Sequence, residues 1–504
     1  MNRPSIWMSV LSTRWPLVSL LLVLLATNFN CGTNEDPEVT ASDEADSRLP
    51  SSGGVRFTVA LHFRSRLGIG LESVRFGEIH SHTSLSLDAV GFAAVDGVKI
   101  KAPDEAIVYA RDVQKLDFVG LSDHAEATNT LAMPAAHRLK GYTPWRSVLE
   151  TIGAYNDENF SDGKGIIVFA GWEYTNTHGC ADGNQGTLAC SMLGGSTVGY
   201  GHKNVLFKSI APQDLPQDRY GAGGKTAAGF VKATAYDLFS ALAPYRPASG
   251  CSSCEGTALT GIHTPAMGGE GGAHDHRTDW NAMDAAFTCN VEIYSKWGSA
   301  EGPPPSGQSC ADDQPFDYDP SRNDQALTLR TVLYEKWVKG GNAAYLLSFL
   351  GGTDNHWGMP AVFDHPSAGG EMPYRGGVTG IVAPQKTRND LWTGLVKRHT
   401  IAATTSPSGT RMPVLLSVET GGRVLLMGDQ GPHDGKAQVR VLAPSGSSRI
   451  ELLVDGCRTT TVNQDAASTL ISLSQGRHFV YARVSKVVGG VYHQAWTSPV
   501  YLGQ

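Results

Sequence analysis

The chain has 504 residues, of which 41% are hydrophobic and 18% are charged, and its formal net charge is -7. This composition is typical of globular proteins, and the length exceeds what one hydrophobic core supports, so we expect about two or three domains. The negative charge and the absence of a long basic run argue against nucleic acid as a partner, because phosphate backbones are bound by clustered Lys and Arg.

Residues 1–30 have the features of an export signal. Arg3 and Arg14 accompany an apolar stretch from Pro16 to Ala26, which is shorter than the roughly 20 residues of a membrane span. Cys31 follows at the position where bacterial lipoproteins carry their lipid, although the preceding residues match the lipidation motif poorly. We therefore predict export to the periplasm, as a membrane-anchored lipoprotein if Cys31 is lipidated, or otherwise secretion. A lipid on Cys31 would be the chain's only contact with the membrane.

Residues 31–71 are expected to form a flexible acidic tether and lead-in, because residues 34–54 are rich in Ser and acidic side chains. From residue 72 to 410, apolar β-branched runs alternate with helical patterns. The clearest unit is the strand-like VRFGEIH, a helix from Ala102 to Gln114, and the strand-like LDFVGLSDH. This alternation predicts an α/β domain built on a parallel sheet or barrel. Later strands are expected at residues 166–172, 204–207, 258–262, 291–294, 345–350 and 378–383.

After residue 410 the pattern changes to short alternating runs between turn signals, such as KAQVRVLAP, RIELLVDG, HFVYARV and YHQAWTSPVYL. Residues 411–504 are therefore expected to form a small β-sandwich. Candidate ligands do not cluster in this region. We expect it to cap the barrel, with a sugar-binding or partner-binding module as the alternative.

Cysteine usage favours an oxidising compartment, because seven cysteines remain beyond Cys31 and several lie in Gly- and Ser-rich loops. The expected disulfides are Cys180–Cys190, Cys251–Cys254 and Cys289–Cys310, which leaves Cys457 unpaired. A zinc ribbon at Cys251 and Cys254 is disfavoured, because it would need a second cysteine pair at ribbon spacing.

Metal-capable side chains occur at or just after most of the expected strands. In chain order they are His80, His82, Asp88, His124, Glu173, His202, His263, Glu292, Asp354 and His356. Residues i and i+2 of a strand point to the same side, so His80 and His82 can reach one ion, and Asp354 and His356 repeat this spacing. The set predicts several metal ions at the carboxyl ends of the strands.

Three of the expected strands end in an acidic residue, at Asp123, Glu173 and Glu292. Taken singly, each could be a salt-bridged carboxylate. A buried carboxylate is costly unless a cation offsets its charge, so the three together favour metal binding. By contrast, His274 and His276 lie in a Gly-rich loop with no strand to direct them, and we interpret this pair as solvated.

These residues resemble a known family. The segments FGEIHSHTSLSLDA, GLSDH, the Glu173 strand, GHKN, GIHTP and GGTDNH, in this order, are similar to the PHP superfamily, which is named for polymerase and histidinol phosphatase. Within it, VEIYSKWG, GLVKRHTIAATT and AWTSPVYL resemble an exported bacterial branch classed as a domain of unknown function. The resemblance covers roughly residues 72 to 504, but the match to the superfamily at large is confined to the metal motifs.

The resemblance implies a distorted seven-stranded β/α barrel of TIM-like type with two or three divalent ions. Carried over position by position, the ligands fall into three groups: His80, His82, Glu173 and Asp354 for the first ion; Glu173 again with His202 and His263 for the second; and Asp88, His124 and His356 for the third. Asp88 stands where other branches have histidine, which puts the identity or occupancy of the third metal in doubt. Asp123 and Glu292 are candidates to contact substrate or to support the ligands.

Mixed imidazole and carboxylate donors suit Zn, Mn or Fe. Two ions bridged by a carboxylate would lower the pKa of a shared water and polarise the bond under attack. We therefore predict an exported metal-dependent hydrolase, with a phosphate ester of small-molecule or envelope origin as the leading substrate. Glu173, Asp354 and His124 are the predicted catalytic residues, and Lys203 and Lys296 are candidate contacts for substrate oxygens.

Two alternatives stay open. The metals could serve hydrolysis of another ester, an amide or a glycan bond, and the unassigned loops do not distinguish these substrates. Alternatively, the barrel could be a non-catalytic binding module of the cell envelope. The full set of ligands argues against this second alternative, because a barrel without activity would be expected to lose some of them.

Overall fold

The computed structural model describes residues 52–503 except 87–88, 90–96, 126–129, 161–163, 177–199, 217–234, 248–253, 269–275, 309, 311–312, 314, 364–373 and 448. Several sequence predictions fall outside these residues and stay predictions. They concern the export signal (1–30), Cys31, Asp88, His274, Cys180, Cys190 and Cys251.

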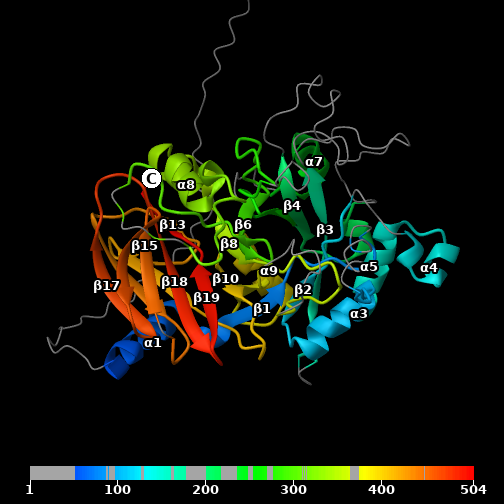
Figure 1. The fold of residues 1–504 in the computed structure, drawn as a ribbon, viewed down its shortest axis with the longest axis horizontal. Helices are drawn as coiled ribbons and strands as arrows, with labels where there is room; N and C mark the ends of the chain where they lie inside the picture. Colours follow the sequence, from blue (N-terminus) through cyan, green and yellow to red (C-terminus); the bar gives the residue numbers. More distant parts are fainter. Residues whose placement is uncertain are drawn as a thin grey trace, which may run out of the picture. The chain divides into compact units, whose positions relative to one another are not determined.

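The fold is mixed α/β and is centred on one 16-stranded sheet (Figure 1). The strands that carry or precede the metal-capable residues are β1 (Val74–Glu78), β2 (Phe118–Gly120), β3 (Ile167–Asn176), β4 (Gly201–Phe207), β5 (Ala258–His263), β6 (Thr288–Ser295) and β8 (Ser348–Gly351). The first six neighbour one another in chain order, while β8 and the two-residue β7 (Gly298–Ser299) both pair with β6. The strands predicted from the apolar runs are confirmed, with shifts of a few residues at their ends.

Strand β3 illustrates how the sequence builds this core. Its side chains alternate between two hydrophobic clusters, with Val168 and Trp172 in one and Ile167 and Phe169 in the other. Such two-sided burial is typical of a strand that is covered on both faces. Further along the strand, the face of Ile167 and Phe169 continues into Glu173, so an apolar layer gives way to a polar layer.

Helices lie beside the strands, and the principal ones are α3 (Pro103–Val108) with the π-helical η2 (Tyr109–Val113), α5 (Pro144–Tyr155), α7 (Ala235–Leu242), α8 (Leu329–Leu333) with the π-helical η8 (Tyr334–Lys339), and α9 (Arg388–Val396). The helix predicted at residues 102–114 is confirmed as α3 with η2. The short helices are α4 (Ala135–Leu139), η1 (Leu71–Ser73), η3 (Thr130–Ala132), η4 (Pro212–Asp214), η5 (Ala243–Tyr245), η7 (Gln325–Leu327) and η9 (Ala343–Tyr345).

Helix α5 shows why these segments are helical. Thr143 caps its first turn by accepting a hydrogen bond from the backbone N–H of Arg146, and a proline follows the cap. Trp145, Val148 and Ile152 are buried at helical spacing. The indole of Trp145 packs edge-on against Trp172 of β3, with ring centroids 5.3 Å apart.

The predicted parallel barrel is found only in part. β1, β2 and β3 pair in parallel, as do β5, β6 and β8, but β4 is antiparallel to both of its neighbours, and β9 (Gly377–Val382) is antiparallel to β1. Between β8 and β9, Gly377 donates to the Gly352 carbonyl and Gly351 donates to the Thr379 hydroxyl. A side-chain hydroxyl takes the place of a ladder partner there, so the described strands do not close into a TIM-like barrel.

The C-terminal strands form two groups. The first is a four-stranded antiparallel sheet of β11 (Leu415–Thr420), β12 (Arg423–Leu426), β14 (Lys436–Leu442) and β17 (Ala466–Ser472). The second extends the central sheet and comprises β10 (Thr400–Thr404), β13 (Gln430–Gly431), β15 (Arg449–Val454), β16 (Cys457–Val462), β18 (His478–Val488), β19 (Val491–Thr497) and β20 (Val500–Leu502). The strands predicted from the alternating runs are thus confirmed.

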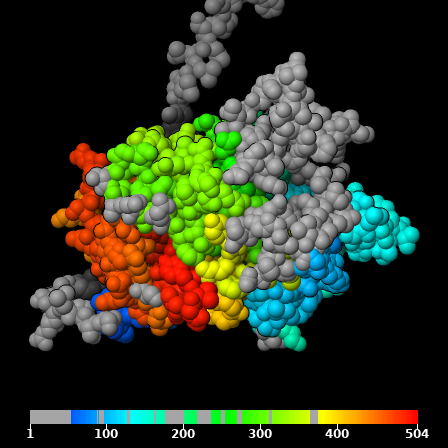
Figure 2. All heavy atoms as spheres, viewed as in Figure 1, coloured from blue at the N-terminus to red at the C-terminus, as the bar shows by residue number. Residues whose placement is uncertain are grey.

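The two groups share buried side chains, such as Val439 and Val441 from the first and Ile450 and Val480 from the second. Strand β10 joins the second group to the rest of the fold by pairing with both β9 and β19. In Figure 2 the yellow surface, which includes β9 and β10, is in contact with the red surface of the C-terminal strands. The C-terminal region is therefore continuous with the central sheet.

Helix α1 (Ser52–Leu67) was not predicted. Val59 and Phe63 are fully buried, and the helix contacts β14 and β17. Its apolar residues do not form a regular stripe, so periodicity gave no signal for it. The flexible segment expected over residues 31–71 therefore does not extend over α1. None of the described helices combines the length and apolar character needed to cross a bilayer.

The disulfides of the described residues are Cys254–Cys289 and Cys310–Cys457. The predicted pairs Cys251–Cys254 and Cys289–Cys310 are therefore wrong, as is an unpaired Cys457. The fold brings together cysteines that are 35 and 147 residues apart, which spacing along the chain cannot show. Both bonds fit an oxidising compartment.

Candidate metal centre

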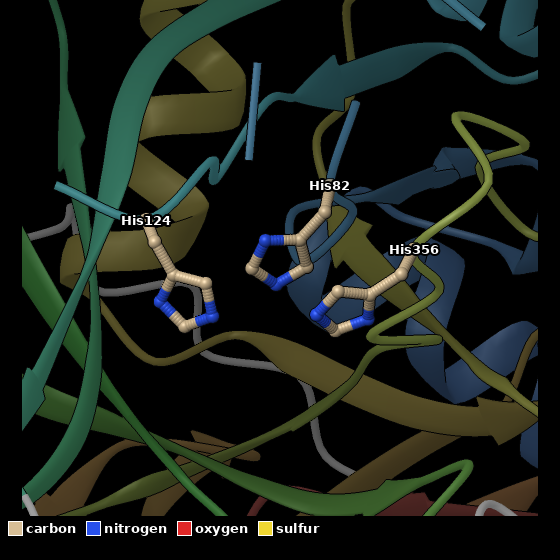
Figure 3. Close-up of side chains that lie close together, drawn as sticks. All are labelled: His82, His124 and His356. Atoms are coloured by element: carbon tan, nitrogen blue, oxygen red, sulfur yellow. The ribbon is translucent and has the colours of Figure 1, made fainter. Parts of the chain in front are cut away.

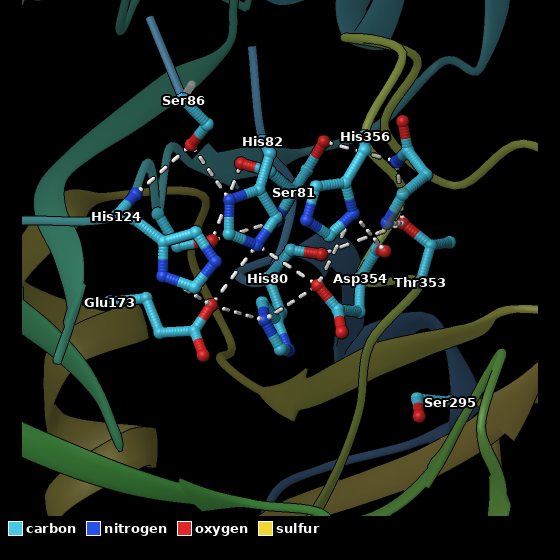
Figure 4. Close-up of polar contacts among 12 residues, drawn as sticks. His80, Ser81, His82, Ser86, His124, Glu173, Ser295, Thr353, Asp354 and His356 are labelled. Atoms are coloured by element: carbon cyan, nitrogen blue, oxygen red, sulfur yellow. Dashed lines mark hydrogen bonds and ion pairs between the residues drawn. The ribbon is translucent and has the colours of Figure 1, made fainter. Parts of the chain in front are cut away.

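Buried polar side chains gather where the strands of the central sheet end (Figure 4). His80, His82, Glu173 and Asp354 lie closest together, and none is more than 3% exposed. Glu173 lies within β3, whereas His80 and His82 follow β1 and Asp354 follows β8, so each is in or close to a strand held by ladder hydrogen bonds and core packing.

Four donor atoms of these residues converge on one point. His80 Nε2 lies 3.2 Å from Glu173 Oε2 and 3.1 Å from Asp354 Oδ1, and the corresponding distances for His82 Nε2 are 3.0 and 2.9 Å. Donors bound to one tetrahedral ion at about 2.0–2.2 Å lie roughly 3.3–3.6 Å apart. A small expansion of this first group would therefore accommodate an ion.

The contacts of the other ring nitrogens indicate the tautomers of His80 and His82. His80 Nδ1 lies 2.9 Å from Glu292 Oε2, and His82 Nδ1 lies 2.9 Å from the Ser86 hydroxyl. A neutral imidazole that donates from Nδ1 presents a lone pair at Nε2, and that lone pair faces carboxylate oxygens here. His82 Nε2 and Asp354 Oδ1 have no hydrogen-bond partner although both are buried. A cation is the group that this arrangement fits.

The pKa shifts of His80 and Asp354 also favour positive charge between these residues. Burial alone would lower the pKa of His80, but Asp354 and Glu292 outweigh it and raise that pKa well above its ordinary value. Burial alone would raise the pKa of Asp354, but His80 and His263 hold it well below the usual range. Positive charge is therefore strongly stabilised at this position.

A second group contains His202, His263 and His276, whose candidate ligand atoms all lie within 4.8 Å of one another. Nε2 of His202 and of His263 are buried without a hydrogen-bond partner. The interpretation of His276 as solvated is wrong, since it is 6% exposed and stacks on His202 with ring centroids 3.9 Å apart. Its Gly-rich sequence context carries no signal of this burial, because distant segments of the fold create it.

A third group contains His82, His124 and His356 (Figure 3). The ring of His82 stacks on that of His356 with centroids 4.1 Å apart and lies 4.6 Å from that of His124. The His124 side chain is the most exposed of the three, at 13%, and its Nδ1 lies 2.9 Å from the Thr175 hydroxyl. The fold thus brings together His124 and His356, while Asp88 lies outside the described residues.

Asp123 organises the loop that follows His82. Its carboxylate accepts hydrogen bonds from the Thr83 backbone at 2.7 Å and from the Ser86 hydroxyl at 3.1 Å. Ser86 in turn contacts His82 Nδ1 and accepts a hydrogen bond from the His124 backbone. Asp123 therefore acts on the histidines through the loop.

Glu78 and Trp297 are two contributors that sequence reasoning missed. The Glu78 carboxylate accepts hydrogen bonds from the backbone of His80 at 2.9 Å and of Thr353 at 3.0 Å, and so ties the first histidine motif to the loop before Asp354. The Trp297 indole donates to Asp354 Oδ2 at 2.5 Å. The sequence did offer a signal for Glu78, because an acidic residue stands there at the end of a strand-like run.

Glu292 lies behind two of the histidine rings. Its Oε2 faces His80 Nδ1 at 2.9 Å and its Oε1 faces His263 Nδ1 at 2.7 Å. A carboxylate in this position fixes the tautomer and orientation of both rings. Of the two roles predicted for Glu292, support of the ligands fits this geometry.

The two candidate lysines lie in different places. Lys203 pairs with Tyr174 across β3 and β4, on the opposite face from Glu173, and its ammonium bonds to the Tyr200 carbonyl. Burial lowers its pKa to about 7. Lys296 is also buried, and its Nζ lies 4.9 Å from the centroid of Trp357, the residue after His356. Lys203 therefore lies on the face of β4 away from Glu173, and Lys296 contacts the segment that carries His356.

Comparison with known proteins adds little. No protein-family model matches the chain, and no curated protein matches it in sequence. A solved structure from Bacteroides vulgatus, described as a two-domain protein containing a predicted PHP-like metal-dependent phosphoesterase, aligns with 82% of this chain and 91% of its own at 13% identity. The TM-score of this alignment is 0.34.

Proposed function

We propose that the protein is a metal-dependent hydrolase of PHP type, and that it acts as a phosphoesterase. The observation that carries the proposal is the first group, in which two imidazole nitrogens and two carboxylate oxygens face one another at 2.9–3.2 Å, and in which His82 Nε2 and Asp354 Oδ1 are buried without a hydrogen-bond partner. Buried atoms in this arrangement are costly without a cation.

The three groups would hold two or three ions of Zn, Mn or Fe. Bound there, divalent ions would supply Lewis acidity, lowering the pKa of a bound water and polarising the ester. Glu173 connects two groups, because Oε2 belongs to the first and Oε1 lies 2.6 Å from His202 Nδ1. Asp88 is the proposed fourth member of the third group.

The chain's own residues would orient the donors and the substrate. Glu292 and Ser86 hold the Nδ1 side of His80 and His82, so that Nε2 of each ring faces the ion position. His124 is the most exposed histidine of its group and its ring is fixed by Thr175, so we assign it to contact with the substrate. We place Lys296 beside the substrate oxygens.

A phosphate ester is the proposed substrate because several cations held in one centre would neutralise its non-bridging oxygens. Carboxylic esters, amides and glycans are the competing substrate classes. We further propose that the protein is exported, which the two disulfides support.

The test is hydrolysis of chromogenic phosphate monoesters and diesters by the purified protein, after chelation and after return of Zn, Mn or Fe. We expect activity only with metal, and a loss of about three orders of magnitude in Glu173→Gln, since Lewis acid catalysis contributes several kcal/mol. Glu150→Gln, which changes an exposed carboxylate on α5, is the matched control. Activity that survives both chelation and Glu173→Gln would contradict the proposal. Metal-dependent cleavage of carboxylic esters or amides alone would reassign the bond.

A further inference from the structure

We propose that His276 is a metal ligand, and that it completes a three-histidine site with His202 and His263. This inference rests on the proposed function, because the same buried pocket must bind divalent ions. It also assigns a role to a histidine that the sequence motifs of the site do not include.

The three rings share one feature, which is that an oxygen holds Nδ1 from behind. The distances are 2.6 Å for His202 to Glu173 Oε1, 2.7 Å for His263 to Glu292 Oε1, and 2.7 Å for His276 to Thr264 Oγ1. Histidines that bind metals characteristically engage their second nitrogen in this way, which fixes the tautomer and the ring orientation. Nε2 of each ring is then the atom that remains for an ion.

The rings are also close enough to share an ion. The His276 ring centroid lies 3.9 Å from that of His202 and 5.4 Å from that of His263. The candidate ligand atoms of all three lie within 4.8 Å of one another, so an ion would draw them in by at most about 1.5 Å to reach tetrahedral spacing. Nε2 of His202 is buried without a hydrogen-bond partner, and Nε2 of His263 faces Asp354 Oδ2 at 3.1 Å.

The backbone holds His276 in this position. Its N–H donates to the Met267 carbonyl at 2.9 Å, and Thr278 donates to the Pro265 carbonyl at 2.9 Å. Gly201, the residue before His202, lies against the same segment with φ +69, and a Cβ there would collide with the Thr278 hydroxyl. A glycine at this position lets β4 and the His276 segment approach closely enough for the rings to stack.

Thr264 adopts φ +36, a backbone conformation that β-branched residues rarely show. It follows His263 directly, and its hydroxyl is the group that contacts His276 Nδ1. Backbone strain of this kind persists where the surrounding structure enforces it, and it concentrates at functional sites. Thr264 therefore connects His263, which precedes it in the chain, to His276, which its hydroxyl contacts.

A three-imidazole site would differ in charge from the first group, which contains two carboxylates. Three neutral ligands suit Zn with an open fourth position, and Asp354 Oδ2 lies 3.1 Å from Nε2 of His263. In this arrangement Glu173 supports His202 through Nδ1.

The first test compares zinc content in the full chain, in His276→Ala and in His137→Ala. His137 is the matched control, because a hydroxyl also holds its Nδ1, from Ser147 at 2.8 Å, but it belongs to none of the candidate metal groups of the described residues. At a fixed free zinc concentration, we expect His276→Ala to bind one ion fewer per chain, or one ion with at least about 10–100-fold lower affinity, and His137→Ala to match the wild type.

The second test uses cobalt and does not depend on activity. In His276→Cys, we expect a thiolate-to-cobalt charge-transfer band that the cobalt-loaded wild type lacks, because the introduced thiolate would take the place of the imidazole. Circular dichroism reports whether each variant is folded. If His276→Ala does not fold, the cobalt band of the cysteine variant decides.

The outcomes separate this inference from the proposed function. A wild type that binds no ion would contradict both. A wild type that binds ions, together with an unchanged zinc content in His276→Ala and no new band in His276→Cys, would overturn the role of His276 and leave the proposed function standing.

Discussion

Two buried clusters of charged residues in this protein have opposite arrangements. The metal centre brings carboxylates and histidines together so that acceptor atoms face one another. A second cluster, here called the junction cluster, consists of Glu301, Asp313, Arg330 and Arg483, each at most 5% exposed. Arg330 and Arg483 lie 2.5 and 2.7 Å from Asp313 Oδ2, so opposite charges meet directly.

The two clusters differ in the groups that compensate their buried carboxylates. Burial alone would raise the pKa of Asp313, but Arg483 and Arg330 outweigh it and lower that pKa. Tyr481 also donates to Glu301 at 2.5 Å. The junction cluster therefore balances its carboxylates with arginines, which are always charged, whereas the carboxylates of the metal centre face imidazoles, which carry charge only when protonated. The junction cluster joins the segment after β6 to β18, which makes it structural.

The largest effect is expected from Arg330→Met in the junction cluster. Removing one partner leaves buried carboxylates uncompensated, so we expect the free energy of unfolding to fall by about 3–5 kcal/mol. Arg458→Met is the matched control: Arg458 also contacts Asp313 but is 24% exposed, and we expect a loss of about 1 kcal/mol or less. Urea unfolding measures both. Altered metal content in Arg330→Met would contradict the separation of the two clusters.

The disulfide near the junction cluster should give the next largest effect. Cys310 and Cys457 close a loop of the chain that spans 147 residues. We expect the double variant Cys310→Ser/Cys457→Ser to lose about 2–4 kcal/mol of stability in urea. Its metal stoichiometry should equal that of the wild type. An unchanged unfolding midpoint would show that the bond adds nothing to this region.

A smaller effect is expected at the metal centre from Glu292→Gln. The amide cannot accept from both His80 and His263 as the carboxylate does, so both rings lose part of their orientation. We expect the affinity for metal to fall by about 10–100-fold, measured by titration with a chromogenic chelator. Glu451→Gln, beside the junction cluster, is the control and should leave the affinity unchanged. Equal metal affinities in Glu292→Gln and Glu451→Gln would contradict the role of Glu292 in orienting the two histidines.

The smallest effect is expected from Lys203→Met, and it depends on pH. Burial lowers the pKa of Lys203 to about 7 from an ordinary value of 10.5, so the unfolded chain binds more protons between these values. Wild-type stability gains from this group as pH rises from 7 to 10.5, and the burial penalty is fully present below 7. We therefore expect Lys203→Met to be more stable than the wild type by on the order of 1 kcal/mol at about pH 7, and less so at about pH 10. Phosphoesterase activity should be retained, because Lys203 lies on the face away from Glu173. A variant that is less stable at neutral pH, or inactive while folded, would contradict this placement.

Local patterns in the sequence predicted much of the fold, because an apolar run followed by a polar residue has the same meaning wherever it occurs. β3 and Glu173 are an example, since alternation alone indicates which face the carboxylate shares with the core. The direction of β4 could not be predicted in this way, because an isolated run does not show whether its neighbour is parallel. The same limit hid His276, whose burial depends on the close approach of Gly201, and the pairing of Cys310 with Cys457.

Metal analysis tests the central claim most directly. Elemental analysis of the purified wild type, loaded with Zn, Mn or Fe and freed of excess ions, should find two or three ions per chain. His82→Ala/Glu173→Ala should remain folded and hold at least one ion fewer, since it removes two of the four donors of the first group. A folded wild type without metal after loading, or a variant with the same metal content as the wild type, would contradict the presence of a metal centre at these residues.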